Sequence, residues 1–192
     1  NKSLINHYTT NKRLYTINEL IDNRDKILDV IWFLKDELSH RYNFVNNFIE
    51  KGEKPANHYL NFLKTLNTII NSINLLEMRG RDSLGLCFQF CIDIDDNNLE
   101  WYNKNKINQN YLSVISKNKI IIYAVYKHFN RIGVLGENAK HILDQFVHDD
   151  IIISLLKSGK YENISIVAHT RWASVGQVNL KNVHPHINLN KI

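Results

Sequence analysis

The chain has few of the residues that interrupt or crosslink a fold. Its 192 residues include only two prolines, seven glycines and two cysteines, which excludes a loop-dominated, low-complexity or disulfide-rich protein. It also lacks an apolar stretch long enough to span a bilayer, and it begins without the apolar segment of a signal peptide. We therefore expect a soluble cytoplasmic protein with no membrane partner.

Charge of one sign is present only in mild excess. The formal net charge is +5, and the basic residues are scattered along the chain rather than gathered into a patch interleaved with aromatics. A solvated surface is therefore expected, and no nucleic-acid partner. With 44% hydrophobic residues, the chain is long enough for one domain with a substantial core.

The two cysteines, Cys87 and Cys91, lie four residues apart within one apolar run. On a strand this spacing places both side chains on the same face. Neither a CxxC spacing nor a second pair of ligands accompanies them. We expect free, buried thiols rather than a disulfide or a zinc site.

Helical periodicity dominates the first part of the chain. Apolar residues recur at helical intervals from Ile17 to Leu38, Thr16 and Glu19 have the spacing of a capping box, and Gly52 suits the end of that helix. A second helix is predicted from Pro55 to Met78.

The middle of the chain predicts strands. Residues 84–94 form an apolar, partly β-branched run closed by the turn-forming sequence "DDNN". Residues 111–116 and 120–129 flank a "KNK" turn and predict a hairpin, and residues 163–170 predict a final strand. A helix is expected at 137–159, ending at Gly159. Helices flanking several strands indicate the α+β class, with the first helices as an added layer.

The stretch "AHTRWASVGQVNLKNVHPH", residues 168–186, gathers polar and aromatic residues behind the last strand. His169, His184 and His186 have no metal-ligand spacing, so no metal site is expected. The guanidinium of Arg171, beside the indole of Trp172, suits a carboxylate held by two parallel hydrogen bonds. The residues alone leave open whether that carboxylate belongs to an amino-acid ligand or to a structural salt bridge.

This stretch closely resembles the "AHTRWATHG…NAHPH" signature of the glutaminase domain of the glucosamine-6-phosphate synthases (glutamine–fructose-6-phosphate transaminases). Upstream, "LLEMRGRDSLGL", residues 75–86, resembles the family's "LEYRGYDSAG(I/L)". The two motifs occur in the family's order. Other class II amidotransferase families, with "GHxRY" or "RGPD" at these places, are less similar.

The resemblance implies a class II glutamine amidotransferase domain of the N-terminal-nucleophile type, an αββα sandwich of two antiparallel sheets, here with extra helical insertions. In that family an N-terminal cysteine attacks the side-chain amide of L-glutamine and no cofactor is needed. A sugar isomerase domain of the same polypeptide or complex passes the ammonia to fructose 6-phosphate, and homodimers are common. A catalytically inactive binding or regulatory module on the same fold is the alternative.

The resemblance also assigns roles to residues. Arg171 is expected to bind the α-carboxylate of glutamine, Trp172 to lie beside the pocket, and Ser174 to bond the amino-acid end. Residues expected to support or cover the pocket are Arg79, Gly80, Asp82, Ser83 and His184. No catalytic residue is expected in the chain, because the N-terminal cysteine and the downstream Asn-Gly are absent and valine replaces a family histidine at Val175.

The same resemblance gives the expected domain organisation. Residues 1–192 are expected to be a single, incomplete amidotransferase domain. Residues 1–54 are expected to form an inserted helical layer, because the family has a shorter region before its first motif.

Overall fold

The computed structural model describes residues 16–130, 134–172 and 178–187. The chain divides into two compact units, residues 1–46 and 47–192. The second unit combines helices with an antiparallel sheet, so the α+β class is confirmed. Ser174 and Val175 lie outside the described residues. In the part of the chain that is described, no helix combines the length and the apolar character that crossing a membrane requires.

The first unit is a run of helical residues, α2 (Ile17–Trp32), the π-helix η1 (Phe33–Leu38) and α3 (Ser39–Asn46). Its predicted capping box is confirmed: Glu19 N donates to Thr16 Oγ1 over 3.3 Å, and Thr16 N donates to Glu19 Oε2 over 2.8 Å. The predicted end was wrong, because the helix stops at Asn46, before Gly52. Gly52 instead has a positive φ of 89° in the following turn.

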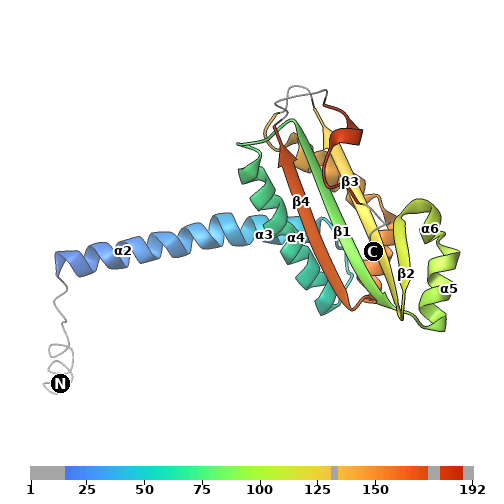
Figure 1. Cartoon of the computed structure of the whole chain (residues 1–192). Coiled ribbons are helices and arrows are strands. Elements are labelled where there is room, and N and C mark those ends of the chain that lie inside the picture. Colours follow the sequence, from blue (N-terminus) through green and yellow to red (C-terminus); the bar gives the residue numbers. More distant parts are fainter. Residues whose placement is uncertain (1–15, 131–133, 173–177, 188–192) are drawn as a thin grey trace, which may run out of the picture. The chain divides into compact units, whose positions relative to one another are not determined.

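The second unit contains one four-stranded antiparallel sheet of order β2-β3-β1-β4. The predicted strands and hairpin are confirmed. The strands are β1 (Ser83–Asp93), β2 (Leu112–Ser116), β3 (Lys119–Phe129) and β4 (Asn163–Arg171). Figure 1 shows β4 at one edge of the sheet and β2 at the other, with β1 and β3 between them.

The predicted helix after Pro55 is α4 (Asn57–Leu76). Two further helices were missed, α5 (Asp96–Lys104) and α6 (Ile107–Asn110). The "DDNN" sequence starts α5 rather than making a turn, because Asp95 Oδ1 accepts a hydrogen bond of 2.6 Å from Asn98 N and so caps the helix.

The single helix predicted for residues 137–159 is two helices, α7 (Glu137–Val147) and α8 (Asp150–Ser158). The break occurs because Asp149 caps α8, accepting from Ile152 N over 3.1 Å. The other carboxylate oxygen of Asp149 accepts from Tyr126 Oη over 2.7 Å, which ties the break to β3. Gly159 ends α8 with a φ of 67°, as predicted.

The core lies between one face of the sheet and α4, α7 and α8. Side chains at even positions of β1 and β3 are buried there, and Phe88 lies at the centre. Its ring centroid is 5.2 Å from that of Phe146 on α7, 5.8 Å from Phe62 on α4 and 5.9 Å from Tyr126 on β3. These rings join the helix layer to the sheet.

The odd positions of the sheet face the other way. Cys87 and Cys91 lie together on this face, as their spacing predicted, and both are free. Only Cys87 is buried, whereas Cys91 is partly exposed. Tyr123 and Val125 of β3, on the same face, are also partly exposed. Within the second unit this face is therefore less covered than the one under the helices.

We predict that Phe88→Ala lowers the free energy of unfolding by about 3–5 kcal/mol, because the lost ring leaves a cavity among four other aromatic side chains. Chemical denaturation measures the change. Val167→Ala is the control, since Val167 is 55% exposed on the edge strand β4 and its truncation leaves little cavity. Equal losses for the two variants would contradict this description of the core.

Candidate functional site

The two sequence motifs meet at one end of the sheet. Ser83, which begins β1, is the register partner of Arg171, which ends β4, although 87 positions separate them in the sequence. Asp82 N donates to Arg171 O over 3.1 Å, and Asp82 O accepts from Asn130 N over 2.9 Å. The turn after α4 is therefore fixed between β3 and β4.

Gly80 permits this close approach. A Cβ added at Gly80 would lie 2.9 Å from the carbonyl carbon of Arg171 and 3.1 Å from the backbone nitrogen of Trp172. Both contacts are with backbone, which has little freedom to move away. Next to it, Arg81 Cζ lies 5.9 Å from the ring centroid of Trp172, a cation–π distance. The site thus needs a glycine at position 80 for a steric reason.

Two buried polar side chains also fix the turn between α4 and β1. Asn138, at the start of α7 and fully buried, donates from Nδ2 to Arg81 O over 2.7 Å and accepts through Oδ1 at 2.7 Å from a ring nitrogen of His128. Glu77, also fully buried, accepts from Gly136 N at 2.5 Å. The predictions missed Glu77 and Asn138. The sequence signal for Glu77 was its place within the "LLEMRGRDS" motif.

Arg171 is partly buried and already bonded. Its Nη1 donates to Asn182 O over 3.1 Å. Ser83, Asn179 and Val183 lie around the same gap, which is too small to hold a water molecule. A ligand carboxylate can reach the guanidinium only if the segment from Val178 to Val183 shifts, or if the ligand approaches from another side.

The other predicted site residues differ in exposure. Trp172 is 59% exposed. Arg79 is exposed at the end of α4, whereas Ser83 is buried. Gly80, Asp82 and Ser83 lie beside Arg171. The roles of all the predicted site residues towards a ligand stay predictions.

Histidines cluster beside the motifs. The ring centroid of His184 lies 4.8 Å from that of His169 on β4 and 4.5 Å from that of His186. The segment carrying His184 crosses the odd face of the sheet at Gly85, where an added Cβ would lie 1.7 Å from His184 O. No group of three metal-ligating side chains suited to an ion occurs among residues 16–130, 134–172 and 178–187.

The histidine cluster lies near the positive charges of Arg171 and Lys127. The pKa of His169 is lowered from its usual value, first by partial burial and then by the neighbouring charges of His184 and Arg171. The pKa of His186 is lowered in the same direction, by desolvation and by Lys127, His184 and Arg171. These rings are therefore biased towards their neutral forms.

Cys87 is not suited to act as a nucleophile. Burial raises the pKa of the Cys87 thiol to about 11, and the positive charge of Lys127 offsets this only in part. At neutral pH this side chain is a thiol rather than a thiolate. Cys91 lies further along β1, towards the end away from Ser83.

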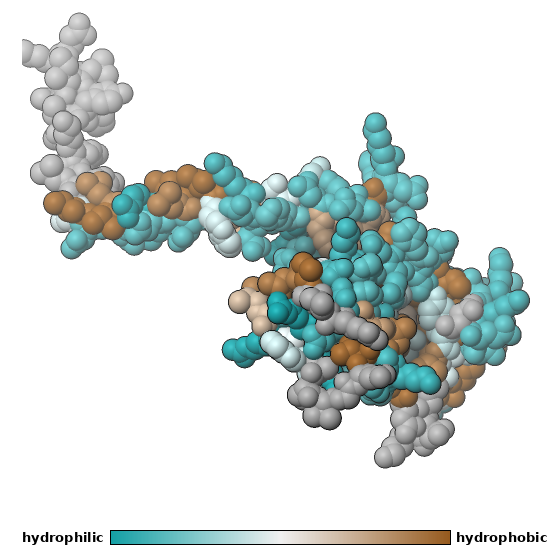
Figure 2. Space-filling view, turned by 90° about the horizontal axis from the view of Figure 1, so that it is seen from above, coloured by the Kyte–Doolittle hydropathy of each residue, from teal (hydrophilic) through white to brown (hydrophobic). Residues whose placement is uncertain are grey.

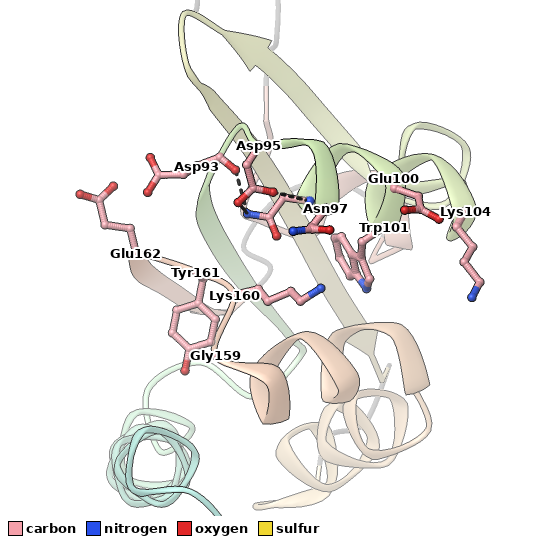
Figure 3. A pocket seen from close by; sticks show the side chains of 11 residues that line it. Asp93, Asp95, Asn97, Glu100, Trp101, Lys104, Gly159, Lys160, Tyr161 and Glu162 are labelled. Atoms are coloured by element: carbon pink, nitrogen blue, oxygen red, sulfur yellow. Dashed lines mark hydrogen bonds between the residues drawn. The ribbon is translucent and has the colours of Figure 1, made fainter.

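A larger cleft, of about 720 Å³, lies at the opposite end of the sheet, between α5 and the loop from Gly159 to Glu162. Figure 3 shows Lys160 extending towards Trp101, with Asp95 bonded to its own helix. Lys119 pairs with Asp93 over 2.5 Å and with Glu162, and these carboxylates raise its pKa. The cleft contains charges of both signs, and three of its carboxylates, those of Asp93, Asp95 and Glu162, already have partners, so it indicates no ligand class.

Comparison with known proteins finds no family model that matches the chain, and no similar curated protein or solved structure. The arrangement of the two motifs therefore has to be interpreted from its own geometry.

We predict that Gly85→Ala displaces the segment carrying His184, because the new methyl group would overlap the His184 carbonyl oxygen. The stacking of His169 on His184 should be lost, which changes the imidazole resonances of both residues in NMR spectra. Ser165→Ala, also at an odd position of the sheet, should leave them unchanged. Unchanged resonances in Gly85→Ala would show that the segment does not lie on the sheet in solution.

A second prediction concerns pH. Because the pKa of His169 is lower in the folded than in the unfolded protein, the unfolded chain binds the proton first as the pH falls. The stabilising contribution is therefore present above the unfolded pKa of about 6.5 and is lost as the pH falls through the lower folded value. Denaturation midpoints between about pH 7.5 and 5 should fall less steeply in His169→Gln. Ser165→Ala, which is also on β4 and removes no titratable group, is the control and should retain the wild-type slope.

Proposed function

We propose that the chain forms part of a glutaminase domain of the class II glutamine amidotransferase type, with L-glutamine as its ligand. One observation carries the proposal. Two motifs that resemble that family separately in the sequence lie together in space, with Ser83 opposite Arg171 and Gly80 against the Arg171–Trp172 backbone. This proximity supports the relation between the two motifs that the resemblance implies.

The odd face of the sheet supports the fold implied by this proposal. In an αββα sandwich, a second antiparallel sheet packs on the face that the helices leave free. The partly exposed side chains of Cys91, Tyr123 and Val125 suit that packing, because burying them would remove apolar surface from water. The second sheet is part of the proposal, whereas the described residues form one sheet.

In the proposed pocket, the Arg171 guanidinium holds the α-carboxylate of glutamine by two parallel hydrogen bonds, and the exposed indole of Trp172 shields the pair from water. The bond from Arg171 Nη1 to Asn182 O is exchanged for one to the ligand. The Ser174 hydroxyl bonds the amino-acid end, and the loop that carries His184 covers the pocket. The turn that supports the pocket is formed by Arg79, Gly80, Asp82 and Ser83.

The chemistry follows the family pattern. A cysteine thiolate outside this sequence attacks the glutamine side-chain amide, ammonia leaves, and water hydrolyses the thioester to glutamate. A sugar isomerase domain then transfers the ammonia to fructose 6-phosphate. Neither Cys87 nor Cys91 replaces that cysteine, because the α-amino group that serves as the base is part of a peptide bond at an internal residue.

A second function, a non-catalytic binding or regulatory module, is favoured by a different observation. The gap beside Arg171 is closed, and its guanidinium bonds a backbone carbonyl of its own chain. Such a contact would hold the segment from Val178 to Val183 in place rather than bind a ligand.

Replacing Arg171 distinguishes the two functions. If Arg171 holds the carboxylate, Arg171→Ala should weaken L-glutamine binding by about 2–4 kcal/mol, because one partner of a partly desolvated charge pair is lost. Arg171→Lys should restore only part of the affinity, since an ammonium group cannot make the planar two-bond contact. Calorimetric titration of L-glutamine into the chain gives the affinities, and thermal denaturation gives the stabilities.

The control is Lys104→Ala, which removes a positive charge from the cleft at the opposite end of the sheet and should leave the affinity unchanged. A structural Arg171 gives the reverse pattern: lower thermal stability in Arg171→Ala and no change in glutamine binding. No L-glutamine binding by the wild-type chain would overturn the proposed pocket.

A further inference from the structure

One edge of the sheet is only partly paired. Strand β3 has eleven residues, whereas β2 has five and begins at Leu112, opposite Tyr123. Figure 1 shows β2 beside only one part of β3. The chain comes to β2 from helix α6, which ends at Asn110, so no strand continues further along β3. Among the described residues, the part of β3 from Val125 to Phe129 therefore has no strand on that side.

The pairing between β1 and β3 shows which backbone groups point to this open side. At one end of the pair, Asn130 N donates to Asp82 O over 2.9 Å. At the other end, Ile94 N donates to Asn118 O over 2.9 Å. Even positions of β3 therefore bond to β1. Because the bonding direction alternates along a strand, odd positions turn their N–H and C=O groups to the open side.

The open edge thus presents backbone donors and acceptors at Val125, Lys127 and Phe129. One of these groups confirms the direction, because Lys127 O accepts a hydrogen bond of 3.3 Å from Gln145 Nε2, a side chain of α7. An extended peptide chain satisfies such a row of alternating N–H and C=O groups, as it does when a strand is added to a sheet.

A pocket of about 360 Å³ lies at the place where β2 begins. Tyr111 and Leu112 form one wall of it. The lining also includes Tyr123 and Val125 from one face of the sheet and Tyr126 from the other face. Since both faces contribute, the pocket lies beside the edge of β3, in the line that a strand continuing β2 would follow.

The one carboxylate that lines this pocket is already bonded. Asp149 Oδ1 accepts from Tyr111 Oη over 2.5 Å and from Ile152 N over 3.1 Å. Asp149 Oδ2 accepts from Tyr126 Oη over 2.7 Å. The other lining side chains are aromatic or aliphatic, as Ile151 is. The pocket therefore suits an apolar side chain rather than a cation.

Lys127, two positions further along the open edge, suits a negative charge. It is partly buried, and no carboxylate of the described residues pairs with it. Desolvation lowers the pKa of Lys127, and its interaction with Cys87 opposes this shift only in part. A carboxylate beside the ammonium group would stabilise its charged form.

We propose that the open edge of β3 binds an extended peptide segment of another protein, in line with β2 and antiparallel to β3. An apolar residue of the peptide lies opposite Val125 and enters the pocket. An acidic residue two positions before it lies opposite Lys127, because side chains two positions apart share a face and opposite residues of paired strands are neighbours.

Two observations favour such a peptide over other occupants. In the face of the second unit that Figure 2 shows, hydrophobic side chains lie in small groups among hydrophilic ones, whereas docking through apolar area alone needs a larger patch. The same edge of a second copy is a poor partner, because the centred antiparallel register would place Lys127 opposite its counterpart, where like charges repel.

Fluorescence anisotropy with the whole chain tests this proposal. The probe is a fluorescein-labelled peptide, Gly-Ser-Thr-Thr-Glu-Thr-Val-amide, in which Val would lie opposite Val125 and Glu opposite Lys127. The expected dissociation constant is on the order of 100 µM, as for a short peptide with few contacts. No binding up to about 1 mM would overturn the proposal.

Methylation of single peptide nitrogens tests the backbone pairing. A methyl group on the nitrogen of Glu or Val removes an N–H that bonds to β3 and should weaken binding at least about tenfold. The same group on the Thr between them should change the dissociation constant less than about twofold, because that N–H points away from β3. Equal affinities of the three methylated peptides would overturn the proposed pairing.

Reversing the charge at Lys127 tests the choice of peptide. Lys127→Glu should weaken binding of the Glu peptide at least about fivefold, and a peptide with Lys in place of Glu should prefer this variant to the wild type. Lys117→Glu, in the turn at the other end of β3, makes the same change in net charge and should alter affinity less than about twofold.

Equal affinity of the Glu peptide for the wild type and Lys127→Glu would overturn the predicted acidic residue and with it the proposal. The open edge contains no residue of the proposed glutamine pocket, so either proposal can fail alone.

Discussion

Burial of one face of β1 under three helices is the constraint on which the rest of the second unit depends. Phe88 contacts rings from α4, α7 and β3, so the helix layer and the sheet share one cluster. Because side chains alternate along a strand, this burial also fixes which residues face the other way. A slip of one residue would expose Phe88 and bury Cys87 in its place.

The candidate site follows from that register. With Phe88 held in the core, β1 pairs with β4 so that Ser83 lies beside Arg171, and the turn before β1 reaches the backbone of Trp172. Gly80 and Gly85 are required at two points of close approach, to Arg171 and to His184. Buried hydrogen bonds from Asn138 and to Glu77 hold the turn from the helix side, so the position of the motifs does not depend on a ligand.

The two units have different physical character. The second buries aromatic side chains from several elements and is stable through its own core. The first unit exposes the Ile and Leu side chains of α2 on one side, although a capping box between Thr16 and Glu19 stabilises the N-terminus of this helix. Local sequence therefore suffices to start α2, and its apolar side does not contribute to a core among the described residues.

Local patterns in the sequence determined the capping box at Thr16, the four strands, the hairpin and the glycine that ends α8. They failed at Asp95 and Asp149, because an aspartate that caps a helix has the same local sequence as one in a turn. The choice at Asp149 depends on Tyr126, which is distant in sequence. The sequence also marked Arg171 and the "RGRDS" turn as related. Only the tertiary structure decided that Asn182 accepts from Arg171 and that the His184 segment crosses the sheet at Gly85, since both contacts join segments whose spacing no periodicity encodes.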